Sequence, residues 1–277
     1  MTLEHDKGAL ESILRRDRVV VIACLLIVSA GAWLYLWAGA GMGMSMWDMT
    51  HPPKTGMNMN MVMPQSWSPG YAVVMFFMWW IMMIAMMLPS ATPTILLSSA
   101  LNRRSSSDTQ PYGNAAVFAL GYLFAWALFS LAAVFAHWLL EQAGVLSMLM
   151  ESASRILSGL LLILAGVWQF TPYKNACLTH CQSPVEFLVR HRRPGNRGAL
   201  LMGLHHGYYC LGCCWFLMAL LFVGGVMNLY WIIGLAIYVY LEKALSGGQW
   251  LPRLTGAALL AWGAVLLGGS LLAEGLP

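Results

Sequence analysis

Two histidines and three cysteines interrupt an apolar run between residues 203 and 215. On a helix, His206, Cys210 and Cys213 follow the spacing i, i+4, i+7 and share one narrow stripe, while His205 and Cys214 flank it. Imidazole and thiolate side chains are ligands for soft metal ions. The spacing therefore predicts that this helix forms one wall of a metal site.

A second group of metal-binding side chains lies upstream. Cys177 and Cys181 form a C-x-x-x-C pair that encloses His180. The segment between the two groups can return to the membrane on the same side. Both groups can then meet, because His206 lies only about 9 Å along the helix from residue 200. The combined set predicts a four-coordinate site for Cu(I) or Zn²⁺ built from Cys177, Cys181, His206, Cys210 and Cys213. The alternative is that the thiols pack as small apolar groups and the histidines bond to carbonyls.

Methionine is concentrated in one part of the chain: fourteen of the 20 methionines lie between residues 42 and 87. Within residues 39–70 they alternate in two blocks separated by His51. Thioethers favour Cu(I) and form no disulfides in an oxidising compartment. We expect this segment to capture Cu(I), the alternative being that methionine fills an apolar surface. The candidate ligands are Met42, Met44, Met46, Met57, Met59, Met61 and His51.

Further along, Met78, Met82 and Met86 recur at every fourth residue, and Met83 and Met87 form a parallel pair. Successive sulfurs on such a helix lie about 6 Å apart along its axis. The spacing resembles the M-x-x-x-M element of high-affinity copper uptake transporters. It fits a ladder of thioethers for Cu(I), and it also fits ordinary packing of a membrane helix.

The composition places these groups in a membrane protein. Of 277 residues, 59% are hydrophobic and 9% charged, and the mean hydropathy is +0.67. The net charge of +4 does not indicate nucleic-acid binding, because the basic residues lie in short segments between apolar runs.

The apolar runs predict an all-α, polytopic transmembrane bundle. Residues 1–18 form a cytoplasmic basic tail, 19–38 the first transmembrane helix, 39–70 a flexible Met-rich outer loop and 71–273 a six-helix membrane domain. The second span is expected to end at Pro89, and residues 171–198 to form a polar loop. The first run could instead be a cleaved signal peptide, although its aromatic end favours a retained helix. The seven predicted spans are residues 19–37, 71–88, 115–138, 156–170, 200–223, 229–241 and 256–272.

Lys and Arg set the predicted orientation. With the N-terminus inside, thirteen of the 15 basic residues fall on the inner side, and only Lys54 and Arg155 lie outside. The Met-rich loop is then outside, and Cys177 and Cys181 face a reducing compartment in which disulfides are not expected. Glu242, Lys243 and His137, near the ends of spans, fit either interfacial anchors or a transport role.

Several motifs resemble a bacterial family of predicted metal-binding integral membrane proteins of unknown function. The similarity rests on Cys-Leu-Gly-Cys-Cys-Trp at 210–215, Met-Met-Ile-Ala-Met-Met-Leu-Pro at 82–89, and Gln-Phe-Thr-Pro-Tyr-Lys-Asn-Ala-Cys-Leu at 169–178 with Cys181 and Pro184. Met-Asn at 227–228 and Glu-Lys at 242–243 also match it. The resemblance implies a polytopic fold, metal binding and the inner membrane of a bacterium.

These patterns favour a protein that captures Cu(I) on the outer loop, relays it along the methionines and receives it on the His/Cys cluster. Its partners are the lipid bilayer, the metal ion and, in one reading, a metalloprotein. One alternative is an accessory that binds metal without moving it, for the assembly of a membrane oxidase. Another is a membrane thiol oxidoreductase that uses Cys210 and Cys213. An enzyme is the least favoured reading, because the chain has no Ser/His/Asp set and no phosphate-binding glycine loop.

Overall fold

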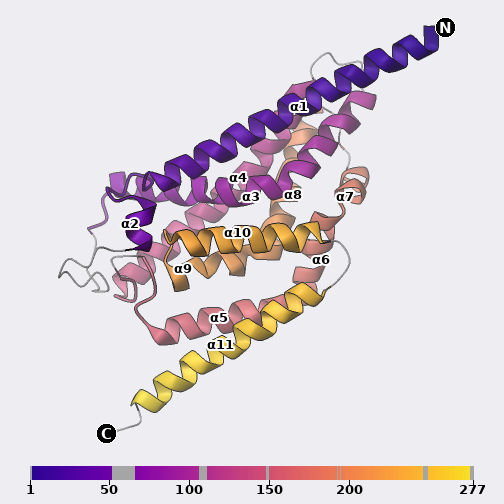
Figure 1. Cartoon of the computed structure of the whole chain (residues 1–277). Helices are drawn as coiled ribbons and strands as arrows, with labels where there is room; N and C mark the ends of the chain where they lie inside the picture. The colour runs from indigo at the N-terminus through magenta and orange to yellow at the C-terminus, as the bar shows by residue number, and fades with distance from the viewer. Residues whose placement is uncertain are drawn as a thin grey trace.

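The computed structural model describes residues 2–51, 66–105, 111–147, 150–191, 193, 195–245 and 249–274. In these residues the regular structure is helical, apart from an isolated bridge between Leu146 and Ser152. Figure 1 shows the helices running along one common direction, with α1 and α11 at opposite sides. The helices are α1 (Thr2–Trp37), α2 (Met46–Thr50), α3 (Pro69–Ser105), α4 (Pro111–Gln142), α5 (Arg155–Gln169), α6 (Pro172–Gln182), α7 (Pro184–Arg190), α8 (Gly195–Ala219), α9 (Leu221–Gly224), α10 (Leu229–Ala244) and α11 (Trp250–Glu274).

Five stretches are long and apolar enough to cross a membrane, so the chain has the character of a multi-pass membrane protein. The stretches are Arg18–Trp37, Pro69–Ala100, Asn114–Gln142, Gly195–Gly224 and Trp250–Gly269. A sixth is reached if α5 and α6, which meet at 66°, form one broken span. The one expected span that is not among these, residues 229–241 in α10, belongs to a helix of 16 residues, a length of about 24 Å against a hydrocarbon core of roughly 30 Å.

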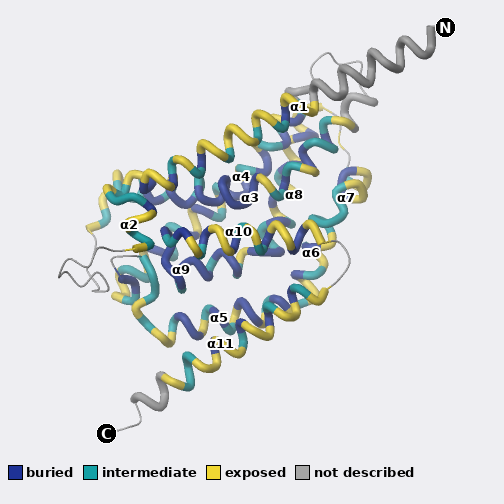
Figure 2. The backbone as a smooth tube through the Cα atoms, in the orientation of Figure 1, coloured by how far each residue is buried: buried dark blue, intermediate teal, exposed yellow. Residues whose placement is uncertain are grey.

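Helix α8 lies at the centre of the packing. It packs against α4 and α6, while α3 packs between α1 and α4, and α10 packs on α3. Helices α5 and α11 form a pair that joins the rest through α5 and α8. Figure 2 shows that α1 is largely exposed, and only 11% of its apolar stretch is buried. Helix α1 is therefore a peripheral helix whose apolar side chains are available to lipid.

The backbones of α4 and α8 touch through glycines. A Cβ on Gly203 would collide with the Phe118 carbonyl, and a Cβ on Gly121 with the Leu200 carbonyl. Gly207, four residues after Gly203, lies against Ala125. Small residues at this spacing allow membrane helices to approach closely. The approach brings the cysteine face of α8 against α4.

Helix α3 does not end at Pro89, so that expectation was wrong. It continues through Pro89 and Pro93 to Ser105. A proline removes one backbone donor, and such a break is tolerated in a membrane helix that packs against its neighbours. Between the two prolines, the Ser90 hydroxyl donates to the Met87 carbonyl at 2.8 Å, and the Thr92 hydroxyl to the Leu88 carbonyl at 3.1 Å. The methionines of α3 therefore sit in the first half of a long unbroken helix.

The expected polar loop at residues 171–198 is also wrong, because it contains α6 and α7. Thr171 caps α6 by accepting from the Lys174 amide, and Pro172 takes the first helical position, where its missing N–H costs nothing. As a result Cys177 and Cys181 are one turn apart on a helix that packs against α8.

The Met-rich segment is partly structured. Ser45 caps the short helix α2, and Gly41 lies against Val74 of α3. The segment reaches this place through a turn in which Gly39, Ala40, Gly41 and Gly43 have positive φ. The expectation of an entirely flexible loop is therefore wrong for residues 46–50, whereas Met57, Met59 and Met61 lie outside the described residues. We call this end of the bundle the α2 end, and the opposite one the α6–α7 end.

Candidate metal centre

The predicted stripe of α8 faces the interior. His206, Cys210 and Cys213 are each at most 3% exposed, and Cys214 is also fully buried. The face is buried because α4 packs against one side of it and α6 against the other. Local helical spacing thus places these side chains together, away from water.

Helix α6 adds a fourth thiol. The side chain of Cys181 lies near those of Cys210 and Cys213. The Cys213 and Cys214 thiols donate to the Cys210 carbonyl oxygen at 3.0 and 2.9 Å. Cys181, Cys210, Cys213 and Cys214 form what we call the thiol cluster. Cys177 lies beside it, with its sulfur against Gly212, where a Cβ would come within 2.7 Å. All six cysteines of the chain are free.

Two side chains from other helices converge on Cys210. The Tyr122 hydroxyl of α4 lies 3.1 Å from the Cys210 sulfur and donates to the Met87 carbonyl oxygen of α3, also at 3.1 Å. The Lys243 ammonium of α10 donates to the Cys210 sulfur and to the Ser90 hydroxyl, each at 3.0 Å. The sulfur of Cys210 is therefore the point at which α3, α4, α8 and α10 meet.

A buried ion pair lies beside the thiol cluster. The Lys174 ammonium is 2.7 Å from Glu242 Oε1, and neither side chain is exposed to solvent. The Tyr238 hydroxyl donates to the same carboxylate at 3.0 Å, and the Gln182 amide to the Glu242 carbonyl oxygen at 2.8 Å. A buried charge needs such partners, since an unpaired one is costly.

The interpretation of Glu242 and Lys243 as interfacial anchors is therefore wrong. Helix α10 continues to Ala244, which carries both charges into the protein interior. The sequence feature that pointed to these two residues was a pair of adjacent opposite charges at the end of an apolar helix. Sequence reasoning missed Tyr122 and Lys174 as neighbours of the thiols, and Tyr122 has no distinguishing local pattern.

The histidines separate into buried and surface positions. His206 is buried among the rings of Phe118, Tyr122 and Phe187, and its Nδ1 has no hydrogen-bond partner. His205 is exposed. The structure thus brings His206 close to the thiol cluster and leaves His205 on the outside of the helix.

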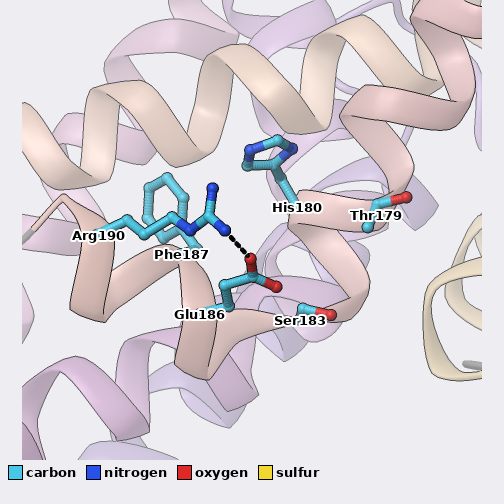
Figure 3. Close-up of a pocket in the computed structure, with 6 residues that line it drawn as sticks. All are labelled: Thr179, His180, Ser183, Glu186, Phe187 and Arg190. Atoms are coloured by element: carbon cyan, nitrogen blue, oxygen red, sulfur yellow. Dashed lines mark ion pairs between the residues drawn. The ribbon is translucent and has the colours of Figure 1, made fainter.

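His180 lies at the α6–α7 end, where its ring stacks on Tyr209 at 4.3 Å. It borders a pocket of about 70 Å³, also lined by Thr179, Ser183, Glu186, Phe187 and Arg190. Figure 3 shows this pocket, with the ion pair of 2.7 Å between Glu186 and Arg190. None of the lining residues is a cysteine, so the pocket does not open onto the thiol cluster.

The methionines predicted to form the ladder are all buried: Met78, Met82 and Met86 are at most 2% exposed, and Met83 and Met87 are fully buried. Met75, which precedes them on α3, is also fully buried. We call these six residues the methionine stripe. At its inner end the backbone carbonyl of Met87 accepts from the Tyr122 hydroxyl, which also contacts the Cys210 sulfur. The last turn of the stripe therefore lies next to the thiol cluster.

The candidate ligands of the Met-rich segment that the structure describes lie at the α2 end. Met46 is buried in the core, and Met42, Met44 and Met49 are partly buried. His51 is exposed, with its Nε2 3.1 Å from the Tyr230 hydroxyl. Met42, Met46 and Met49 pack in or against the core of the bundle.

Across the described ranges, no three His, Cys, Asp or Glu side chains are arranged to hold a metal ion together. A preformed tetrahedral zinc site would need four such ligands. Cu(I), by contrast, is stable with two or three sulfur ligands, and thiolates and thioethers select it. The donor set therefore suits Cu(I) as a cargo better than a resident zinc ion.

Residues 76–266 match a protein family described as PpoB2, copper chaperone. The matched range includes the thiol cluster and most of the methionine stripe, and it leaves out the Met-rich segment. No curated protein and no solved structure matches the chain. Because the match covers more than half of the sequence, the chain belongs to the PpoB2 family of copper chaperones.

Proposed function

We propose that this protein is a membrane copper chaperone that receives Cu(I) at the α2 end, passes it along the methionine stripe and holds it on the thiol cluster. One observation carries the proposal: the Tyr122 hydroxyl lies 3.1 Å from the sulfur of Cys210 and donates to the backbone carbonyl of Met87, the last methionine of the stripe. The last turn of the stripe and the thiols, which are separate in sequence, are thus neighbours in the fold.

The order of the donors gives the path a direction. Thioethers are neutral and bind Cu(I) less tightly than thiolates, so affinity rises from the stripe to the thiol cluster. The metal-binding form of cysteine is the thiolate. The Lys243 ammonium, 3.0 Å from the Cys210 sulfur, offsets a negative charge there until Cu(I) takes over that role.

The proposed orientation places the α2 end outside and the α6–α7 end inside. The distribution of charge supports this orientation. Lys174 and Arg190 belong to α6 and α7. Lys243 is near the last residue of α10 and Arg253 near the first residue of α11, and these helix ends also lie at the α6–α7 end. In the seven-span version of this arrangement, α10 crosses as a short helix shielded by α3 and α6.

A second candidate is an accessory that binds Cu(I) and hands it to a membrane metalloprotein without moving it across the bilayer. The family description as a chaperone favours this version. Flux of Cu(I) into proteoliposomes separates the two. A transporter accumulates copper inside the vesicles, whereas an accessory holds a fixed amount of copper per protein and shows no flux.

The copper content of anaerobically purified protein tests the proposal itself. The wild type should retain Cu(I) in preference to Zn²⁺, and a Cys210→Ala/Cys213→Ala variant should lose most of it. Cys24→Ser is the matched control, because Cys24 is an exposed thiol alone on α1. Unchanged copper in the double variant, or no copper in the wild type, would contradict the proposed function.

A further inference from the structure

A buried histidine at the α2 end is not used by the proposed function. His137, near the end of α4, has a side chain with no solvent exposure. Its Nε2 lies 3.3 Å from Glu141 Oε1, one helical turn away. The indole of Trp67 donates to the other oxygen of that carboxylate. The carboxylate is thus held on one side by Trp67 and on the other by the imidazole.

This pairing leaves one ring nitrogen of His137 open. A carboxylate only accepts hydrogen bonds, so the hydrogen of the pair belongs to Nε2. Nδ1 is buried and has no hydrogen-bond partner. Histidines that bind metals commonly donate their other N–H to a carboxylate, which fixes the orientation of the ring. The unpartnered Nδ1 is therefore in the position of a ligand nitrogen.

Aromatic contacts place His137 over the start of the methionine stripe. Its ring lies 6.3 Å from Trp67, which in turn packs on Tyr71 at 5.0 Å. On the other side it lies 5.7 Å from Phe222, which packs on Trp79 at 5.2 Å. Tyr71 and Trp79 are both on α3, eight residues apart, and therefore on the same helical face.

Met75 lies between these two aromatic residues on that face. It is four residues from Tyr71 and four from Trp79, and it is fully buried. It is also the outermost methionine of the stripe. Its thioether is thus the soft donor that lies, along α3, between the two aromatic residues linked to His137, and imidazole and thioether are both ligands for Cu(I).

We infer that His137 Nδ1 and the Met75 thioether form a Cu(I) acceptance site at the α2 end, positioned by the Glu141 carboxylate. The inference rests on the proposed function, since it assigns the first ligands of the same path. In this site Glu141 is a positioning residue, and His137 and Met75 touch the metal. The aromatic pair Trp79 and Phe222 then separates the site from the rest of the stripe.

Nitrogen-15 NMR of the full-length protein in detergent, labelled at histidine and titrated anaerobically with Cu(I), tests the site directly. One Nδ1 resonance, missing in His137→Phe and present in His191→Phe, should move on addition of Cu(I). Glu141→Gln should weaken the Cu(I) affinity read from that resonance by about 10- to 100-fold, the usual effect of losing an orienting partner. Met75→Leu should weaken it as well, whereas Met202→Leu, another buried methionine, should not.

The same titration in Cys210→Ala/Cys213→Ala separates this inference from the proposed function. The shift of His137 should persist there, although the thiol cluster no longer holds copper. If Cu(I) binds the thiols of the wild type and His137 Nδ1 does not move, the acceptance site is refuted and the proposed function stands. If His137 responds and the thiols bind no Cu(I), the proposed function fails. Should His137→Phe not fold, Met75→Leu keeps the ring and still tests the site, because an unaltered shift would contradict it.

Discussion

Lys174 and Lys243 carry two positive charges into a region where neither side chain meets bulk water. The structure gives them different partners: Lys174 pairs with the Glu242 carboxylate, and Lys243 with the Cys210 sulfur and the Ser90 hydroxyl. The division suggests different roles. Lys174 pairs with a carboxylate, whereas the partner of Lys243 is a sulfur that the proposed cargo also needs.

Removing Lys174 should destabilise the protein strongly. Lys174→Met leaves the Glu242 carboxylate buried without its ion-pair partner, and breaking such a pair costs about 3–5 kcal/mol. Thermal unfolding in detergent should show a large fall in the melting temperature. The double variant Lys174→Met/Glu242→Gln should recover most of the loss, since the buried charge is then gone.

Arg190→Met is the matched control for that experiment. It breaks the exposed pair of Arg190 and Glu186, whose side chains are 69% and 55% exposed, and surface pairs contribute about 0–1 kcal/mol. A double variant as unstable as Lys174→Met alone would show that the lysine acts through packing rather than through its charge.

At the scale of the helices, residues without side chains let α4 and α8 approach closely. Gly121 of α4 and Gly203 of α8 each place bare backbone against the carbonyl of the other helix. Van der Waals packing of this kind drives association of membrane helices, since lipid tails compete with any apolar side chain. The interface also holds Tyr122 against Cys210, so the packing of two helices decides the geometry at the sulfur.

Gly203→Ala should therefore affect stability and the metal centre together. The added methyl group collides with the Phe118 carbonyl, and overpacking of this kind typically costs about 1–3 kcal/mol. We expect a lower melting temperature and weaker retention of Cu(I). Gly234→Ala on α10 is the comparison, because nothing lies within 4 Å of a Cβ there. Equal behaviour of the two variants would argue against the close α4–α8 contact.

At the scale of the whole molecule, the α2 end and the α6–α7 end differ in chemistry. Thioethers and the His137–Glu141 pair belong to the first, and thiols with the basic side chains belong towards the second. This polarity matches the two compartments that the positive-inside rule predicts, because thiols persist where the environment is reducing.

Labelling with a membrane-impermeant maleimide checks the orientation. In a Cys24→Ser background, right-side-out vesicles should label Asp48→Cys, whose side chain is exposed at the α2 end. Arg190→Cys, exposed at the α6–α7 end, should label only after the membrane is opened. Labelling of Arg190→Cys in sealed vesicles would show the opposite orientation, and the proposed direction of the copper path would then be wrong.

The sequence by itself determined the features that depend on neighbours along the chain. Apolar runs predicted a helical membrane protein, because a backbone in lipid must satisfy its hydrogen bonds within a helix. That His206, Cys210 and Cys213 share one face followed from the helical period alone, and the structure shows this face buried. The recurrence of the α3 methionines at every fourth residue likewise predicted that they follow one another along a helix.

Only the tertiary structure decided which distant residues complete the centre. Tyr122 is 88 residues from Cys210, and Lys243 is 33 residues from it. Their meeting depends on the glycine contact of α4 with α8, on the prolines that α3 tolerates and on the extension of α10 to Ala244. Such contacts arise from helices packing in three dimensions, and no local period in the sequence encodes them. Local helical spacing thus placed the α8 cysteines of the thiol cluster together. Packing of separate helices added Cys181, the Lys243 ammonium and the Tyr122 contact with the Met87 carbonyl.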